Sequence, residues 1–259
     1  MGKNLLITFL LLALSLSAKS QKSEWNPSDN AMLDGKTIVK VNLLGMPTRN
    51  FGVYGERIIS KRVSFVLGIN SMPEGKIPYI NKFTTEQEIL DIRISSLSMT
   101  PEFRFYLSRS GFSKGFYIAP YYRYEKYKAS SYNLEFEDED YNTQHIMMSG
   151  NLNTHSAGAI IGVQWFLGKR KNISLDWTIF GAHYGANSGQ LKGYTSYPMS
   201  ETTQKDIRKT IEDSFGSIKI GNVVPVKTEN IVVDENNAQV DIKSPWAFIR
   251  SALSVGIRF

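Results

Sequence analysis

The sequence predicts an all-β protein, an eight-stranded antiparallel transmembrane β-barrel with long extracellular loops and one short loop helix. Three observations lead to this prediction. The chain begins with a secretory signal, eight later segments alternate apolar and polar residues, and the connections between them are short on one side and long on the other. An alternation of apolar and polar residues with a period of two is typical of strands whose two faces lie in different environments.

Residues 1–20 have the three parts of a secretory signal peptide. Lys3 gives a positive start, Leu5 to Leu16 form an apolar run, and Ala18-Lys19-Ser20 is a small-x-small cleavage site. A transmembrane anchor is the weaker alternative, because a spanning helix needs about 20 apolar residues. We therefore expect cleavage near Ser20, a periplasmic segment over 21–35 and a barrel domain over 36–259.

The composition excludes several classes of protein. Cleavage would remove Lys3 and Lys19 and no acidic residue, so the formal net charge would fall from +6 to +4, which does not indicate a nucleic-acid binder. The chain has no cysteine, so it has neither a disulfide framework nor the N-terminal cysteine of a lipoprotein. No later segment has about 18 uninterrupted apolar residues, so no transmembrane helix is expected. A barrel needs only alternation over about 10 residues per strand.

Eight segments show this alternation: 37–44, 51–59, 63–70, 101–107, 116–125, 156–167, 173–179 and 249–259. Their apolar faces carry, in chain order, Val39, Val41 and Leu43; Phe51, Val53 and Ile59; Val63, Phe65, Leu67 and Ile69; Phe103, Phe105 and Leu107; Phe116, Ile118, Tyr122 and Tyr124; Ile161, Val163, Trp165 and Leu167; Ile173, Leu175, Trp177 and Ile179; and Ile249, Leu253, Val255, Ile257 and Phe259. Pro101 and Pro120 cannot donate a ladder hydrogen bond, so we expect each at a strand start or a bulge.

The connections support a membrane orientation. The second, fourth and sixth connections are short, whereas the third, fifth and seventh are long, at about 71–94, 126–152 and 187–245. Outer-membrane barrels have short periplasmic turns and long extracellular loops. If both termini are periplasmic, all three long connections lie outside the cell.

The opposite faces of the strands carry nine charged residues, five positive and four negative: Lys40, Glu56, Glu102, Arg104, Arg123, Glu125, Asp176, Arg250 and Arg258. A nearly neutral set fits a narrow interior, because buried charges must be paired. We expect this network to fill the interior without a wide pore, centred on Arg104, Arg123, Glu102, Glu125 and Glu56. Aromatic residues near strand ends are candidates for interfacial girdles, with core packing as the alternative: Phe51, Tyr106, Phe116, Trp165 and Trp246.

Four segments resemble a known type of protein. The terminal Leu253-Ser254-Val255-Gly256-Ile257-Arg258-Phe259 resembles the C-terminal signal that the barrel assembly machinery reads, carried by Leu253, Val255, Ile257 and Phe259. Tyr54-Gly55-Glu56-Arg57, Pro101 to Leu107 (PEFRFYL) and Gly115 to Tyr121 (GFYIAPY) resemble an uncharacterised family of small outer-membrane β-barrel proteins of Gram-negative bacteria. The resemblance implies the fold and an outer-membrane location, and it implies no catalytic residues.

The expected function is therefore a structural or surface-interaction role, with outer-membrane lipid, the assembly machinery and a surface partner of the long loops as partners. A lipid-modifying enzyme of the lipid A deacylase kind and a soluble periplasmic lipocalin-like binder are the alternatives. His155 and Ser156 are the weak signal for the enzyme, although strand neighbours point to opposite faces. No cofactor, metal or nucleic acid is predicted.

Two features of the expected loops remain open. The acidic run Glu135 to Asp140 could hold a divalent cation, but a solvated loop is the better interpretation. Residues 200–215 predict a short helix with Ser200 as N-cap and an apolar stripe of Ile207, Ile211 and Phe215, which would pack on the protein's own loops or cover the barrel. A hairpin around Asn236-Asn237 is also expected.

Overall fold

The computed structural model describes residues 36–76, 92–108, 113–137, 143–217, 219–220, 224–225 and 227–259. Within 131–137 and 214–225 it describes the backbone alone. The expected signal peptide, the segment 21–35 and part of the acidic run at 135–140 lie outside these residues. Among the residues described, no helix is both long and apolar enough to cross a membrane.

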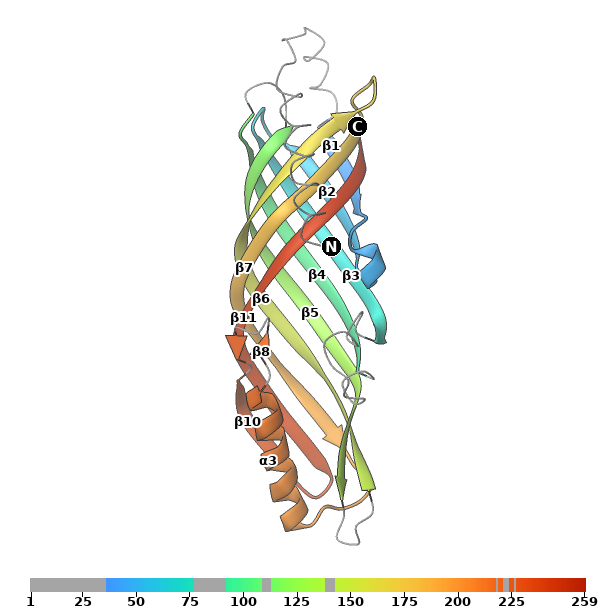
Figure 1. Ribbon diagram of the computed structural model, residues 1–259, viewed down its shortest axis with the longest axis vertical. Coiled ribbons are helices and arrows are strands. Elements are labelled where there is room, and N and C mark those ends of the chain that lie inside the picture. Colours follow the sequence, from blue (N-terminus) through green and yellow to red (C-terminus); the bar gives the residue numbers. More distant parts are fainter. Residues whose placement is uncertain are drawn as a thin grey trace, which may run out of the picture.

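The chain forms one antiparallel sheet of nine strands that closes into a ring (Figure 1). The ring consists, in order, of β1 (Thr37–Asn42), β2 (Phe51–Ile58), β3 (Val63–Lys76), β4 (Arg93–Tyr106), β5 (Gly115–Glu137), β6 (Thr143–Leu167), β7 (Ile173–Tyr194) and β11 (Asn237–Arg258). It closes because β1 pairs with the last residues of β11, from Ile38 opposite Arg258 to Asn42 opposite Ser254. The ninth strand, β10 (Thr228–Val233), pairs with the other end of β11, so the sheet has nine strands and not the expected eight.

Four strands are much longer than the sequence suggested. β5, β6, β7 and β11 have 23, 25, 22 and 22 residues, so they continue far into the segments 126–152 and 187–245 that we expected to be loops. That expectation was wrong because these segments keep a two-residue period but exchange the polarity of their two faces. A strand predicted from apolar residues on one face therefore ends in the prediction where that face becomes polar, although the strand itself continues.

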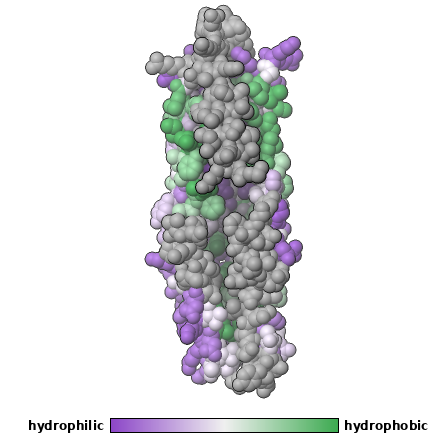
Figure 2. All heavy atoms as spheres, in the orientation of Figure 1, coloured by the Kyte–Doolittle hydropathy of each residue, from purple (hydrophilic) through white to green (hydrophobic). Residues whose placement is uncertain are grey.

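The exchange of polarity divides the molecule into two halves. In the half near the short turns and the C-terminus, at the top of Figure 1, apolar side chains are exposed on the outside and polar ones are buried inside. We call this exposed set the outer apolar band: Val39, Val41, Phe51, Val53, Ile69, Leu97, Met99, Phe103, Phe105, Ile118, Ile161, Ile173, Phe180, Ile249 and Ile257. Figure 2 shows hydrophobic residues gathered in the upper part of one face and hydrophilic ones at its lower end.

In the other half the inner face is apolar. The face of β6 that carries buried Thr154 and Ser156 also carries buried Ile146 and Met148 further along the strand. Likewise, the inner face of β11 changes from Ser244 to Ile242 and Val240. The exposed outer face there is mainly polar, with Lys126, Lys128, Asn151, Ser188, Lys192 and Lys243.

The helix α3 (Glu201–Ser217) packs against this apolar inner face (Figure 1). Ile207 and Ile211 join one buried cluster with Ile146, Met148, Met199, Ile231, Ala238, Val240 and Ile242. The expected apolar stripe therefore packs on the protein's own strands; the side chain of its third member, Phe215, is not described. Ser200 caps the helix, because its Oγ accepts a hydrogen bond from the Thr203 amide at 3.3 Å.

The hairpin expected around Asn236-Asn237 joins β10 to β11. The Asp234 carboxylate accepts hydrogen bonds from the backbone amides of Asn236 and Asn237 at 3.0 and 2.8 Å. These contacts, with the Asn237 side-chain amide as the largest contribution, lower the pKa of Asp234. A carboxylate that binds the turn's own amides is a common way to fix a short turn.

Pro101 and Pro120 lie in the middle of β4 and β5, so the expectation of a strand start or a bulge was wrong. Pro101 is paired with Leu67 of β3 and Pro120 with Ala159 of β6. The β4–β5 ladder, in contrast, has no pair between Met99–Tyr124 and Glu102–Tyr121, beside Pro101, and none between Glu102–Tyr121 and Phe105–Ile118, beside Pro120. Both prolines thus lie beside the β4–β5 ladder. The two missing N–H donors interrupt this ladder, while the β3–β4 and β5–β6 ladders stay paired at the prolines.

Candidate functional site

The nine charged residues all lie on the inner face of the ring. Seven of them are almost completely buried: Lys40, Glu56, Glu102, Arg104, Glu125, Asp176 and Arg258. The side chains of Arg123 and Arg250 are slightly more exposed. Alternation along the strands brings residues from six strands to one interior, because every second side chain points inward.

Lys40 is the first centre of the network. Its Nζ lies 2.6 Å from Glu56 Oε2, 2.6 Å from Asp176 Oδ2 and 2.7 Å from Gln164 Oε1. An ammonium group has three protons, and here each has one acceptor. Lys40 therefore links β1, β2, β6 and β7 across the interior of the ring.

Arg104 is the second centre. Its guanidinium donates to Asp176 Oδ2 at 2.5 Å and to Glu102 Oε2 at 3.0 Å, and it lies 3.8 Å from Glu56 Oε2. Asp176 is thus shared by Lys40 and Arg104. Buried ion pairs are tolerated when additional hydrogen bonds satisfy the remaining polar atoms.

Two tyrosines supply such hydrogen bonds. The hydroxyl of Tyr106 donates to Glu56 Oε1 at 2.9 Å, and that of Tyr117 donates to Asp176 Oδ1 at 2.8 Å. The Arg104 guanidinium also lies over the Tyr117 ring, 4.4 Å from its centroid. Tyr106 is buried inside, so its assignment to an interfacial girdle was wrong; its place two positions from Arg104 was the signal that could have shown this.

A glycine makes room for Tyr117. Gly162 of β6 lies directly opposite Tyr117 of β5, and a β-carbon at Gly162 would overlap the end of the tyrosine ring. The tyrosine side chain therefore lies over the glycine backbone and reaches Asp176. Only a residue without a side chain allows such a close approach.

Arg123 and Glu125 form a separate pair and are not part of the centre, contrary to our expectation. Arg123 holds both oxygens of Glu125, with Nε and Nη2 at 3.0 and 2.8 Å. Arg250 joins the network at its edge, since its Nη1 lies 3.4 Å from Glu102 Oε1 without a hydrogen bond. Arg258 lies over the ring of Phe166, 5.0 Å from its centroid.

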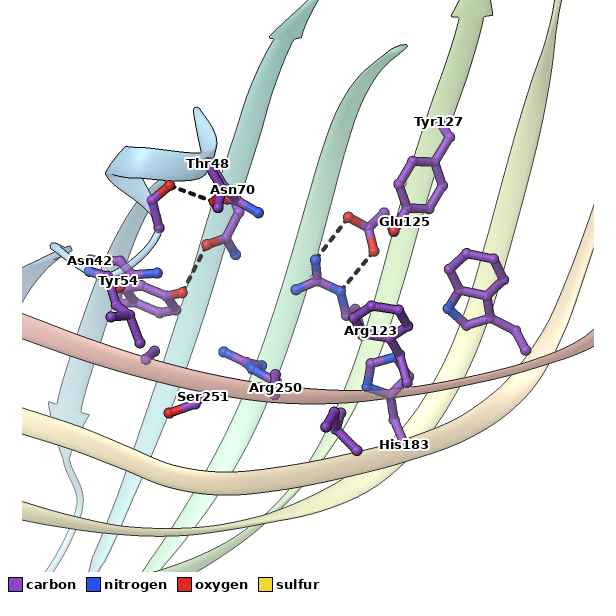
Figure 3. A pocket seen from close by; sticks show the side chains of 17 residues that line it. Asn42, Thr48, Tyr54, Asn70, Arg123, Glu125, Tyr127, His183, Arg250 and Ser251 are labelled. Atoms are coloured by element: carbon purple, nitrogen blue, oxygen red, sulfur yellow. Dashed lines mark hydrogen bonds and ion pairs between the residues drawn. The ribbon is translucent and has the colours of Figure 1, made fainter. Parts of the chain in front are cut away.

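Beside this network the interior contains a cavity of about 360 Å³ (Figure 3). Its polar wall includes Arg123, Glu125, Arg250, Asn70 and His183, which point toward the same space from four strands. The buried Asn70 Oδ1 accepts a hydrogen bond from Tyr54 at 2.8 Å, but its Nδ2 has no hydrogen-bond partner among the described residues. The cavity wall therefore carries one buried amide donor without a hydrogen bond in the described part of the chain and the Arg250 guanidinium, whose Nη1 contacts Glu102 Oε1 only at 3.4 Å.

The apolar part of the cavity wall comes mainly from β11, while Asn42, Thr48, Asn50 and Ser251 add further polar groups. Trp246 and Phe248 stack with their ring centroids 6.5 Å apart, and Trp246 lies 5.5 Å from the ring of Tyr127. Trp246 thus faces the cavity, so its assignment to an interfacial girdle was wrong. Leu44 and Ile249 complete this part of the wall.

In the part of the chain that the structure describes, the wall of the ring has a gap beside this cavity. β11 pairs with β1 only from Ser254 onward and with β10 only up to Ile242, and Leu253 still accepts a hydrogen bond from the Leu43 amide. Between these points its edge has no strand partner on that side among the described residues. Phe248 lies opposite buried His183 and hence on the inner face, yet it is 54% exposed, because it borders both the cavity and this gap.

The opposite border of the opening is the connection from β1 to β2. It contains the short 3-10 helix η2 (Met46–Thr48), followed by Arg49 in the left-handed region at φ 58°. Arg49 donates to the Pro73 and Lys76 carbonyl oxygens of β3 at 3.1 and 2.6 Å. Arg49 therefore covers the free edge of β3 with side-chain hydrogen bonds in place of a strand.

Comparison with known proteins identifies the family. The model of a family described as "Protein of unknown function (DUF3575)" matches residues 6–222. The chain belongs to this family. No curated protein and no solved structure matches the chain.

The match to the DUF3575 family covers β1 to β7 and α3 but ends before β10 and β11. Most of the buried charges, including Lys40, Arg104 and Asp176, thus lie within the matched part. β11 nevertheless closes the ring. The outward-facing Leu253, Val255, Ile257 and Phe259 of the expected assembly signal lie on or next to this closing strand, and Phe259 exchanges two backbone hydrogen bonds with Thr37.

The weak enzymatic signal in this DUF3575 protein does not form a pair. His155 is exposed on the outer face, where its Nδ1 lies 2.5 Å from the Tyr122 hydroxyl. Ser156 is buried on the inner face and donates to the Arg123 carbonyl oxygen at 3.4 Å. Within the described ranges, no group of three or more acidic, histidine or cysteine residues is arranged to hold a metal ion.

Proposed function

We propose that this protein is a transmembrane β-barrel of the outer membrane, plugged by its internal charges, which displays a folded extension outside the cell. One observation carries the proposal. Along the same strands, exposed apolar and buried polar side chains in one half give way to buried apolar and exposed polar ones in the other. Lipid surrounding the first half and water surrounding the second explains this exchange.

The dimensions of the outer apolar band agree with the proposal. On β4 the exposed apolar residues extend from Leu97 to Phe105, close to the about 9–11 residues with which a tilted strand crosses a bilayer. A monomeric protein in water rarely exposes a continuous apolar surface of more than about 600 Å². A soluble lipocalin-like binder would need the opposite arrangement, with an apolar interior throughout.

The interior supports a role other than diffusion of solutes. An eight-stranded ring leaves room for little more than its own side chains. Here Lys40, Glu56, Arg104 and Asp176 fill the middle with direct contacts. The proposed role is therefore structural or one of surface interaction, through the extension formed by α3, β10 and the far ends of β5, β6, β7 and β11.

Single cysteines test this orientation, because the chain has no cysteine of its own. Lys205→Cys places a thiol on an exposed position of α3, and Arg170→Cys places one on the exposed turn between β6 and β7. A membrane-impermeant maleimide should label Lys205→Cys in intact cells and Arg170→Cys only after the outer membrane is permeabilised. Both variants should fractionate with the outer membrane and migrate faster on gels when unheated.

The reverse labelling pattern would invert the proposed orientation. Labelled protein that is monomeric and stable in buffer without detergent would exclude the membrane location altogether.

A further inference from the structure

We propose that the opening between β11 and the β1–β2 connection is a lateral binding site for a single-chain amphiphile with an anionic, oxygen-rich head group, such as a long-chain fatty acid. The inference rests on the proposed membrane location in one respect, because the membrane would supply the ligand. The site itself does not depend on that location. The site is the cavity of about 360 Å³ and its apolar mouth (Figure 3). This volume is at the small end of the range for pockets that bind small molecules, about 300–1,000 Å³.

The mouth of the cavity is suited to a hydrocarbon chain. Leu44, Phe248 and Ile249 are all more than half exposed and lie on the two borders of the opening. Ile249 belongs to the outer apolar band, while its neighbour Phe248 faces the interior. Apolar side chains thus lie both on the outside of the ring and in the cavity at this point, and a hydrocarbon chain in contact with them would be shielded from water on that side.

The inner end of the cavity is suited to an acceptor group. Arg250 Nη1 and Asn70 Nδ2 are buried donors without a hydrogen bond among the described residues, and both residues line the cavity. A buried donor without a hydrogen bond destabilises the folded protein, so the occurrence of two such donors in one place calls for an explanation. A carboxylate or phosphate oxygen entering the cavity would give such donors an acceptor.

The charge of the wall favours an anion. Three charged side chains line the cavity, two arginines and Glu125. Both oxygens of Glu125 are already held by Arg123, so this pair is internally neutral. Arg250 is the other charge on the wall: its Nη1 lies 3.4 Å from Glu102 Oε1 without a hydrogen bond, and Oε2 of the same carboxylate is held by Arg104.

The fluorescence of Trp246 reports binding in the cavity directly, because Trp246 lines the cavity and lies beside Phe248. Replacing Trp25, Trp165 and Trp177 by phenylalanine leaves Trp246 as the single tryptophan. The purified protein in detergent is titrated with 9,10-dibromostearate, whose bromine atoms quench tryptophan fluorescence on contact. A matched protein that keeps only Trp177, on the outer face, reports partition of the probe onto the lipid-facing surface.

We expect saturable quenching of Trp246 and a weaker, non-saturable effect on Trp177. Arg250→Gln should weaken binding at least about tenfold, the effect of losing one charge-assisted hydrogen bond. Asn70→Ala should weaken it less, and Arg258→Gln, an interior arginine outside the cavity, should leave it unchanged. Heat-modifiable gel mobility shows that each variant is folded.

Two further ligands test the chemistry. The methyl ester of the probe, which lacks the charge, should bind about as weakly as the acid binds to Arg250→Gln. Acetate, which lacks the chain, should not compete at millimolar concentration. Equal quenching by acid and ester, equal quenching of Trp246 and Trp177, displacement by acetate, or no quenching at all would each overturn the inference. None of these results depends on the labelling experiment that tests the membrane location.

Discussion

Lys40 Nζ and Asp176 Oδ2 lie 2.6 Å apart, although 136 positions separate the two residues and β1 and β7 are not neighbours in the sheet. The contact therefore crosses the interior of the ring. Arg104 Nη1 reaches the same Asp176 oxygen from β4 at 2.5 Å. One carboxylate oxygen thus contacts two cations that come from different sides of the molecule.

The first prediction concerns this shared carboxylate. Asp176→Asn should lower the free energy of unfolding by about 3–5 kcal/mol, because it removes the negative charge that contacts both buried Lys40 and buried Arg104. Unfolding by urea in detergent, followed by the heat-modifiable gel shift, measures the change. Glu229→Gln is the matched control, since it removes an exposed partner of Lys243 and should cost no more than about 1 kcal/mol. Equal effects of the two substitutions would contradict a buried network that supports the ring.

The second prediction compares two exposed valines. Val53 lies in the outer apolar band and is 51% exposed, and Val232 lies on β10 in the other half and is 44% exposed. If the outer apolar band faces lipid as proposed, Val53→Arg should cost about 2–4 kcal/mol and reduce insertion into membranes, because the arginine would have to leave water. Val232→Arg should change the free energy of unfolding by less than about 0.5 kcal/mol. Similar folding yields of both variants in lipid vesicles would count against a lipid-facing band.

The third prediction separates the two halves of the molecule. Ile211→Ala should destabilise the packing of α3 by about 2–5 kcal/mol, because Ile211 is buried in the apolar cluster. Proteases should then cut the extension faster, while the gel mobility of the ring remains heat-modifiable. The exposed neighbour Glu212 provides the control, and Glu212→Ala should leave the rate of cleavage nearly unchanged. Loss of the heat-modifiable shift in Ile211→Ala would show that the halves do not fold separately.

The fourth prediction uses two glycines. Gly162→Ala should cost about 1–3 kcal/mol, because the new methyl group overlaps Tyr117 and pushes its hydroxyl away from Asp176. Gly55→Ala meets no atom within 4 Å and should be neutral or slightly stabilising. The same urea titration compares them. If Gly55→Ala is the more harmful of the two, the close contact at Gly162 has no structural importance.

The residues that face inward could largely be predicted from alternation. All nine charged residues named from the sequence lie on the inner face, because a two-residue period leaves only two directions for a side chain. The pairing could not be predicted in the same way. Arg123 and Glu125 were expected at the centre, but the sequence separation of residues on different strands says nothing about their height in the ring. Lys40 and Asp176 meet there only because β1 and β7 enter it with a particular register.

The cavity could not be predicted either. Trp246 and Tyr106 were assigned to girdles because aromatic residues near strand ends are common there, and both face the interior. The opening exists because β1 ends at Asn42 while β11 continues past it. No pattern within a single segment shows the difference in length between two strands that pair only after the ring closes.

The sequence by itself determined the antiparallel all-β architecture, the two faces of each strand and the charged character of the interior, because these follow from local alternation. The tertiary structure decided the closing pair of β1 and β11, the partners of each buried charge, the exchange of polarity along the long strands and the opening beside Phe248. These depend on register and strand length across the ring, which are set by contacts between residues far apart in the chain.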